Sequence, residues 1–208
     1  MIFDMDGTLT ATNRLIFDSF NHIVVREGKA PMSDEAIMAL FGPPEEGALV
    51  QIVGPEKLPH AMEEYLAYYE DHHQELASLH DGMGPLLDCL KAAGKKLAVF
   101  TGKGRHTTNI TLRQLGLTDV FDLVVTGNDV QRHKPSGEGI ASIMTSTGTG
   151  PDRTIMIGDS TSDIKAAREV GVAVASVLWE AHFPDEVLAL QPDFVFRKVS
   201  DLKEWLCD

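Results

Sequence analysis

Cysteines and long apolar runs are both scarce or missing in this sequence of 208 residues. The two cysteines, Cys89 and Cys207, lie far apart and form no metal-ligand cluster, so a reducing, cytoplasmic setting is the simpler expectation. No run of about 18 apolar residues occurs, so we expect no transmembrane helix. The N-terminus has no basic segment ahead of an apolar stretch, so we expect no signal peptide.

Basic residues are also few. Lysine and arginine number 18 against 31 aspartates and glutamates, which leaves a formal net charge of -13. Such an acidic chain is a poor electrostatic partner for nucleic acid or an anionic membrane, so we expect neither. A small anion could bind where a metal or a local cationic patch offsets the field. The content of 43% hydrophobic and 24% charged residues is ordinary for a globular protein. The length allows one large domain, or one domain that carries an insertion.

Short, continuous apolar runs recur along the chain and suit strands that are buried on both faces of a parallel sheet. Helical patterns separate them, at 83–93, 140–144 and 161–170. Alternating strands and helices predict an α/β fold with right-handed crossovers. The expected strands are residues 1–3, 96–100, 122–125, 154–157, 172–177 and 193–196.

The segment from 13 to 78 has a different pattern. Its apolar residues follow helical spacing in two stretches, with no convincing strand between them. We therefore expect two units, an α/β core of residues 1–12 and 79–208 and an inserted all-helical cap of residues 13–78. Only three residues precede Asp4, so either the first strand is unusually brief or the natural chain begins upstream.

Four polar clusters are expected at the C-terminal ends of predicted strands, and ligands bind beyond those strand ends in open α/β sheets. Each cluster alone has an ordinary explanation as a turn, a solvated lysine or a helix cap. The first does not match an EF-hand loop, and the second lacks the serine or threonine of a P-loop. All four together favour one shared site. They are Asp4-Met5-Asp6-Gly7-Thr8, Thr101-Gly102-Lys103, Lys134-Pro135, and Gly158-Asp159 with Asp163.

These clusters resemble the motifs of the haloacid dehalogenase superfamily. The run DMDGTLT at 4–10, Thr101, Lys134 and GDSTSD at 158–163 match all four motifs of that family, in order. The resemblance implies a Rossmann-like parallel sheet with helices on both faces. The helical insertion is similar to the family's C1-type cap, which is found in phosphoglycolate phosphatase-like and β-phosphoglucomutase-like members.

The resemblance also implies roles for the acidic residues. Asp4 would be the nucleophile, which is ionised at pH 7 without a base and would form an aspartyl-phosphate. Asp6 would be the general acid and base, with its backbone carbonyl as a metal ligand. Asp4 and Asp159 would hold Mg²⁺ through carboxylate oxygens. Asp163, one helical turn beyond Asp159, would orient a water on the metal or Lys134, and whether it touches the metal itself stays open.

The remaining motif residues would hold the transferring phosphoryl group. Thr101 and the backbone N–H groups of Gly102 and Lys103 would donate hydrogen bonds to its oxygens, and Lys134 would neutralise their charge. The side chain of Lys103 either reaches the substrate or is solvated. His72-His73 is expected at a helix surface and not in a ligand site.

We expect a Mg²⁺-dependent phosphatase that hydrolyses a small phosphorylated metabolite, a phosphomonoester, through an aspartyl-phosphate. A phosphomutase of the β-phosphoglucomutase kind and a non-catalytic binding protein on the same fold are the alternatives. The composition of the predicted cap disfavours the mutase, which must hold a sugar phosphate with cap residues. The cap has twelve acids and only four basic residues, Arg14, Arg26, Lys29 and Lys57. Phosphoglycolate, a sugar phosphate, a nucleotide monophosphate and pyrophosphate stay open as substrates, and so does the oligomeric state.

Overall fold

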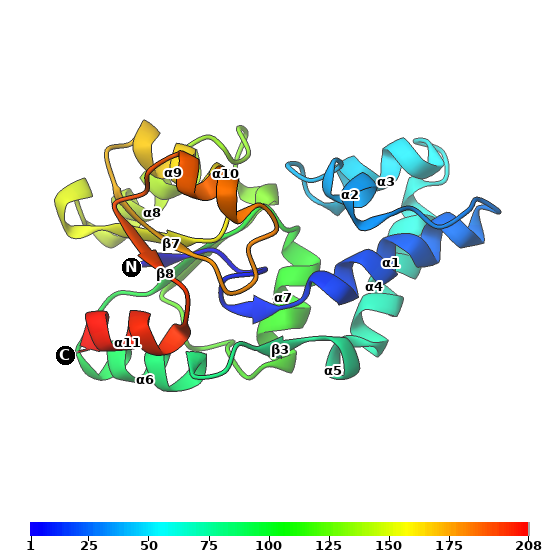
Figure 1. Cartoon of the computed structure of the whole chain (residues 1–208). Coiled ribbons are helices and arrows are strands. Elements are labelled where there is room, and N and C mark those ends of the chain that lie inside the picture. The colour runs from blue at the N-terminus through cyan, green and yellow to red at the C-terminus, as the bar shows by residue number, and fades with distance from the viewer. Residues whose placement is uncertain (208) are drawn as a thin grey trace.

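The computed structural model describes residues 1–207 (Figure 1). A six-stranded sheet lies on one side of the molecule, and a group of helices from residues 13–76 lies on the other. All neighbouring strands in the sheet are parallel, in the order β5-β4-β1-β6-β7-β8. The α/β fold and each predicted strand are confirmed. The strands are β1 (Ile2–Phe3), β4 (Ala98–Phe100), β5 (Leu123–Val125), β6 (Ile155–Gly158), β7 (Ala173–Val177) and β8 (Phe194–Phe196).

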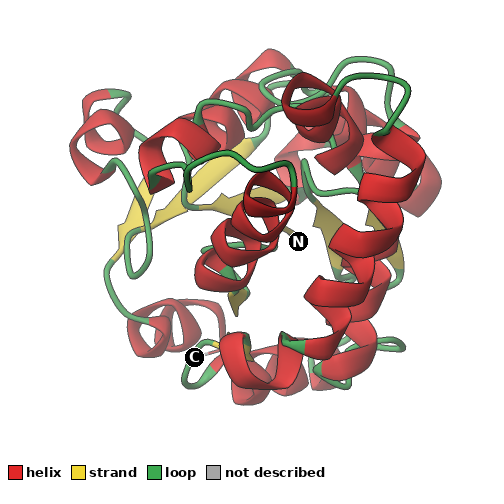
Figure 2. Cartoon of the chain, turned by 90° about the vertical axis from the view of Figure 1, so that its right-hand side faces the viewer, coloured by secondary structure: helices red, strands yellow, loops and turns green. Residues whose placement is uncertain are grey.

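Consecutive strand residues point to opposite sides of the sheet, so both faces of these apolar strands must be buried. Helices cover both faces. Figure 2 shows the strands enclosed by helices. Phe3 belongs to the buried cluster on one face and Ile2 to the cluster on the other. The first face is covered by α6 (Met83–Ala92), α7 (Arg105–Gln114) and α11 (Val199–Cys207), and the second by α8 (Glu138–Thr147), α9 (Thr161–Glu169) and α10 (Pro184–Ala189). No helix within residues 1–207 has both the length and the apolar character that crossing a membrane requires.

The helices of residues 13–76 bury a cluster of their own. Phe20 and Tyr65 are buried in it, with their ring centres 5.0 Å apart. The second apolar stretch forms two helices and not one, because the chain breaks helical geometry at His72. The elements are α1 (Asn13–Arg26), α2 (Asp34–Met38), α3 (Glu45–Val53), α4 (Leu58–Asp71) and α5 (His73–Leu76).

Two chain crossings connect these helices to the sheet. They pair with each other as a short antiparallel ribbon, made of β2 (Thr10–Ala11) and β3 (Ser78–Leu79). Strands of two residues leave no periodic signal in a sequence, so the pattern did not predict this ribbon. It brings the start and the end of the helical segment together.

The two cysteines are joined in a disulfide with an S–S distance of 2.08 Å, although 118 residues separate them in sequence. Cys89 lies in α6 and Cys207 in α11, and these helices pack side by side on one face of the sheet (Figure 1). Sequence separation hides this pairing, which arises only once both helices dock on the same face. Because disulfides are rare in reducing compartments, the cysteines no longer support the cytoplasmic expectation, which stays a prediction.

Candidate active site

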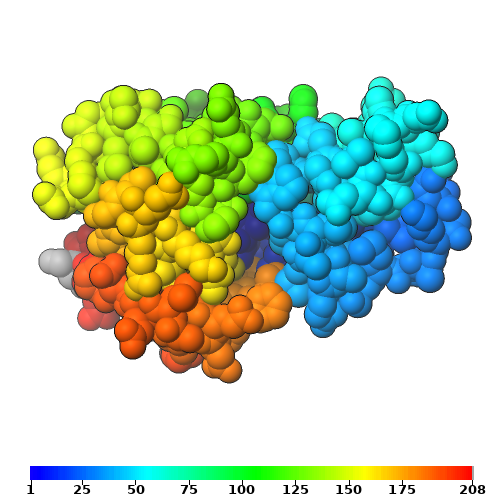
Figure 3. All heavy atoms as spheres, turned by 90° about the horizontal axis from the view of Figure 1, so that it is seen from above, coloured from blue at the N-terminus to red at the C-terminus, as the bar shows by residue number. Residues whose placement is uncertain are grey.

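The polar clusters lie at one edge of the sheet, beyond the carboxyl ends of three adjacent strands. Asp4 follows β1, Thr101 follows β4 and Asp159 follows β6, and β1 lies between the other two strands. All three residues line one cavity of about 510 Å³ between the sheet and the helices of residues 13–76. In Figure 3 a hollow separates these two parts, with the dark-blue atoms of the N-terminal residues at its floor.

Lys134 is placed between two acidic motifs. Its Nζ lies 2.9 Å from Asp4 Oδ1 and 2.6 Å from Asp163 Oδ1. Asp163 is fully buried, and its other oxygen accepts hydrogen bonds from the backbone N–H and the hydroxyl of Ser160 at the start of α9. Burial alone would lower the pKa of Lys134, but Asp163 and Asp4 raise it above its ordinary value. Lys134 is therefore a fixed cation beside Asp4.

Asp159 completes a group of three carboxylates. One oxygen from each of Asp4, Asp159 and Asp163 lies within 4.8 Å of the other two. The Thr8 hydroxyl donates a hydrogen bond of 2.9 Å to Asp159 Oδ1. Gly7 permits this close approach, because its φ is 78° and an added Cβ would lie 2.6 Å from Asp159 Oδ2. The first and last motifs thus meet at Gly7, a position where any residue other than glycine would be strained.

The carboxylates are poorly compensated in the protein alone. Burial raises the pKa of Asp4 to about 7, with Asp163 acting in the same direction and Lys134 opposing it. Burial and the nearby Asp4 raise the pKa of Asp159 well above its ordinary value. One lysine does not balance three ionised acids, so ionisation of the whole group leaves negative charge that a bound cation would compensate. Carboxylate oxygens at this spacing are the ligands that Mg²⁺ prefers.

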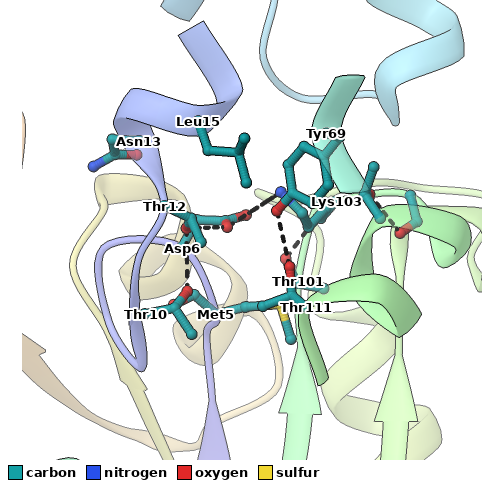
Figure 4. Close-up of polar contacts among 12 residues, drawn as sticks. Met5, Asp6, Thr10, Thr12, Asn13, Leu15, Tyr69, Thr101, Lys103 and Thr111 are labelled. Atoms are coloured by element: carbon teal, nitrogen blue, oxygen red, sulfur yellow. Dashed lines mark hydrogen bonds and ion pairs between the residues drawn. The ribbon is translucent and has the colours of Figure 1, made fainter. Parts of the chain in front are cut away.

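Asp6 lies where the sheet region meets the helical segment (Figure 4). The Thr12 hydroxyl, just before α1, donates a hydrogen bond of 2.5 Å to Asp6 Oδ1. Lys103 Nζ lies 3.2 and 3.3 Å from the two carboxylate oxygens. The Asp6 carboxylate therefore contacts a chain crossing and the loop after β4 at the same time.

Lys103 is a buried partner of Asp6, so of the two alternatives for its side chain, a solvated lysine is excluded. Only 2% of the side chain is exposed, and Nζ lies 4.8 Å from the centre of the Tyr69 ring in α4. Burial by itself would lower the pKa of Lys103, but Asp6, Tyr69 and Glu45 raise it above its ordinary value. The ion pair could not be found from local pattern, because 97 residues separate its partners.

Thr101 and Gly102 line the cavity at the start of the loop after β4. Thr101 Oγ1 accepts a hydrogen bond of 3.1 Å from the backbone N–H of Lys103. That N–H, which the sequence assigned to the phosphoryl group, is directed at Thr101 in this structure. The phosphoryl-binding role of the loop stays a prediction.

Comparison with known proteins places this geometry in a family. The family model for haloacid dehalogenase-like hydrolases matches residues 1–177, a range that contains all eight residues assigned to the site. The chain belongs to this family. The expectation of a hydrolase is thereby confirmed.

Relatives of this haloacid dehalogenase-like hydrolase span nearly its whole length. It is 33% identical over 202 residues to the pyrophosphatase PpaX of Anoxybacillus flavithermus, covering 97% of this chain and 94% of that protein. Two solved structures share the fold. One is described as a predicted phosphoglycolate phosphatase from Haemophilus somnus, with a TM-score of 0.87, 22% identity, and coverage of 98% of this chain and 96% of that chain. The other is a hydrolase from Pseudomonas syringae, with a TM-score of 0.83, 24% identity, and coverage of 99% and 96%.

Glu45 makes contacts at the site of this haloacid dehalogenase-like hydrolase that the sequence motifs did not predict. It is buried at the start of α3, and its carboxylate accepts hydrogen bonds of 2.8 Å from the Gly104 backbone N–H and 2.6 Å from the Thr107 hydroxyl. It therefore satisfies donors in the first turn of α7, from across the cavity. A glutamate in a first helical turn is ordinary in sequence, so no local signal could have singled it out.

His73 is buried, contrary to the expectation of a surface position. Its exposed fraction is 0%, and its Nε2 lies 3.2 Å from the Thr111 hydroxyl. The same hydroxyl lies 2.8 Å from the Tyr69 hydroxyl. The reason is that α5 packs against α7, which covers a face that would meet water in an isolated helix.

Proposed function

We propose that this enzyme is a Mg²⁺-dependent phosphatase that hydrolyses a small phosphomonoester through a phosphorylated Asp4. The proposal depends chiefly on one observation: the Asp4 carboxylate lines the cavity, 2.9 Å from the buried ammonium group of Lys134. A carboxylate nucleophile beside a fixed cation suits an anionic electrophile such as a phosphoryl group. The name of the PpaX relatives, pyrophosphatase, agrees with hydrolysis at phosphorus.

In the proposed reaction, an Asp4 oxygen forms a bond to phosphorus as the bond from phosphorus to the leaving oxygen breaks. Asp6 donates a proton to that departing oxygen, then accepts one from the water that hydrolyses the aspartyl-phosphate. The contacts of Asp6 with Thr12 and Lys103 orient it for both steps. Lys134 lines the same cavity and would balance the charge on the phosphoryl oxygens.

The acidic group fits Mg²⁺ as the metal. Asp4 and Asp159, together with the backbone carbonyl of Asp6, would hold the ion, and Asp163 would act through Lys134. When bound, the ion would supply charge neutralisation for the transferring phosphoryl group. The close approach of the three carboxylates supports this assignment, because a bound cation would offset the burial and repulsion that raise the pKa values of Asp4 and Asp159.

Mg²⁺ should stabilise the folded protein more at pH 8 than at pH 5. The pKa of Asp4 is about 7 in the fold against an ordinary 3.8, so the metal-free fold holds this proton more tightly than the unfolded chain does. The stabilisation that this bound proton gives the metal-free fold is complete below pH 3.8 and is lost as the pH rises to about 7. At a hundredfold excess over Kd, Mg²⁺ should restore about 2.7 kcal/mol. Scanning calorimetry should show a midpoint rise of roughly 5–10 °C at pH 8 and much less at pH 5.

Asp159→Asn provides the check on that stabilisation. The variant removes one proposed ligand and one of the three repelling charges, so it should respond little to Mg²⁺ at pH 8. A midpoint rise equal to that of the parent protein would contradict Asp159 as a metal ligand.

We further propose that residues 13–78 form a cap over a core of residues 1–12 and 79–208. Three features support this division: the helices have their own buried cluster, their two chain crossings pair as one ribbon, and the cavity lies between the two parts. Motion about the paired crossings would admit the substrate and then exclude water from the phosphoryl group. Glu45 reaches across this boundary to α7 in the present structure.

Released phosphate tests the proposed function. The purified enzyme, given a panel of phosphate esters and pyrophosphate, should release phosphate only with Mg²⁺. Lys134→Met should reduce kcat by on the order of 10²–10³-fold, a loss typical of one charge-stabilising donor. Lys165→Met, which removes an exposed lysine of α9, should leave kcat unchanged. Absence of phosphate release from every compound would refute the phosphatase.

A further inference from the structure

We infer that the site takes a phosphomonoester whose leaving group is uncharged and largely apolar, in preference to one that carries a second phosphate or a carboxylate. The inference rests on the proposed phosphatase function and names its substrate class. It departs from the pyrophosphatase name of the PpaX relatives. It depends on the side chains that line the two ends of the cavity.

The two ends of the cavity differ in character. The end at the sheet has the carboxylates, Thr101 and Lys134. The end at the helical segment is lined mainly by apolar side chains from α1, the α2–α3 region and α3. These are Ile16, Phe20, Met38, Leu40, Phe41 and Ala48. A phosphoryl group at Asp4 would therefore direct its leaving group toward apolar surface.

The cations that line the cavity are already engaged. Among the described residues, the lining includes two lysines and no arginine. Lys103 pairs with Asp6, and Lys134 pairs with Asp4 and Asp163. His182 also lines the cavity, where its ring packs 5.8 Å from that of Phe17.

The basic residues of the helical segment are engaged away from the cavity, and none of the four lines it. Each has an acidic or carbonyl partner elsewhere. The partners are Asp18 for Arg14, Glu64 for Arg26, Glu27 for Lys57 and the Ile52 carbonyl for Lys29. A second anionic group at this end would therefore lose its hydration without gaining a partner.

Two exposed aromatic rings stand at the cavity on opposite sides. Phe41, from the helical segment, is 44% exposed, and Phe183, beside α10, is 49% exposed, and both line the cavity. The Phe17 ring packs 6.3 Å from that of Phe41. Exposed apolar rings lining a cavity are suited to contact an apolar ligand group. The volume of about 510 Å³ lies in the usual range for small-molecule sites.

Inert phosphonates test this preference without turnover. Benzylphosphonate and 4-carboxybenzylphosphonate differ by one carboxylate, and methylenediphosphonate has the second phosphate-like group of pyrophosphate. With saturating Mg²⁺, calorimetry should show benzylphosphonate binding at least about tenfold more tightly than either charged compound. Equal or tighter binding of either charged compound would overturn the inference.

A charge placed at the apolar end should reverse the preference. Phe41→Lys should favour 4-carboxybenzylphosphonate over benzylphosphonate by about tenfold relative to the parent, because an ammonium group then faces the carboxylate. Val25→Lys is the matched control: Val25 is an exposed apolar residue of α1 that does not line this cavity, so the preference should not change. The same response in both variants would also overturn the inference.

The two proposals fail in different ways. If benzylphosphonate binds selectively but no ester is hydrolysed, the proposed substrate preference is supported and the proposed phosphatase activity is refuted. If pyrophosphate or phosphoglycolate is hydrolysed with a higher kcat/KM than benzyl phosphate, the phosphatase activity is supported and the proposed substrate preference is refuted.

Discussion

Asp4→Asn should abolish turnover and phosphoenzyme together, a loss on the order of 10⁴-fold or more in kcat. An amide is a poor nucleophile, so no covalent bond to phosphorus forms. The fold should survive, because the substitution removes one of three mutually repelling carboxylates and leaves Lys134 paired with Asp163. At pH 8 without metal, the thermal midpoint should therefore equal or exceed that of the parent.

Rapid-quench labelling with a radioactive phosphate ester, followed by peptide mapping, measures this result. The parent protein should carry the label at Asp4, and the variant should carry none. Asp81→Asn, an exposed aspartate outside the cavity, is the control and should keep full activity and labelling. Labelled protein in the Asp4→Asn variant would assign the nucleophile to another residue.

Asp6→Asn should slow the reaction by about 10²–10⁴-fold with an ester whose leaving oxygen needs a proton. The loss should shrink with p-nitrophenyl phosphate, whose leaving group departs without one. Hydrolysis of the aspartyl-phosphate should remain slow, because the water then lacks its base. The variant should therefore accumulate phosphorylated Asp4 when given the activated ester, which quench labelling would detect. Equal losses with both esters and no trapped phosphate would show that Asp6 is not the acid and base.

The contact between Asp6 and Lys103 requires a second variant. Asp6→Asn leaves a buried ammonium group without its counterion, which typically costs about 3–5 kcal/mol of stability. The double variant Asp6→Asn/Lys103→Met removes both charges and should recover most of that stability. It should keep the same dependence on the leaving group, because the missing carboxyl is the cause. If the double variant also regains activity with both esters, Asp6 acts only through the ion pair.

The similarity to pyrophosphatases and the lining of the cavity point to different substrates. The PpaX relatives share about one residue in three with this chain, so the residues that set substrate preference can differ between them. In the present structure one end of the cavity has the motif residues Asp4, Thr101, Lys134 and Asp159. The opposite end is lined mainly by apolar residues from outside the motifs. Substrate preference can therefore change by substitutions in the helical segment without disturbing Asp4 or Lys134.

Most residues of the candidate site could be placed from the sequence because they lie next to strands with strong patterns. Asp4, Thr101 and Asp159 each follow a short apolar run, and parallel strands end at one edge of a sheet. The four-residue step from Asp159 to Asp163 spans the start of α9, which places both acids in one group. Strand ends and helical spacing are local properties, and so the sequence contains them directly.

Contacts between segments far apart in the chain were decided only by the tertiary structure. The Asp6–Lys103 ion pair, the reach of Glu45 to α7 and the Cys89–Cys207 disulfide each join residues at least 59 positions apart. The amino-acid sequence by itself determined the strands, the helical insertion and the motif residues at the strand ends. How the helical insertion docks on the sheet determined that Lys103 is buried against Tyr69, that the basic residues of the insertion lie away from the cavity, and which apolar side chains line it. Such docking depends on packing and charge balance over the whole molecule, and no short stretch of sequence contains that information.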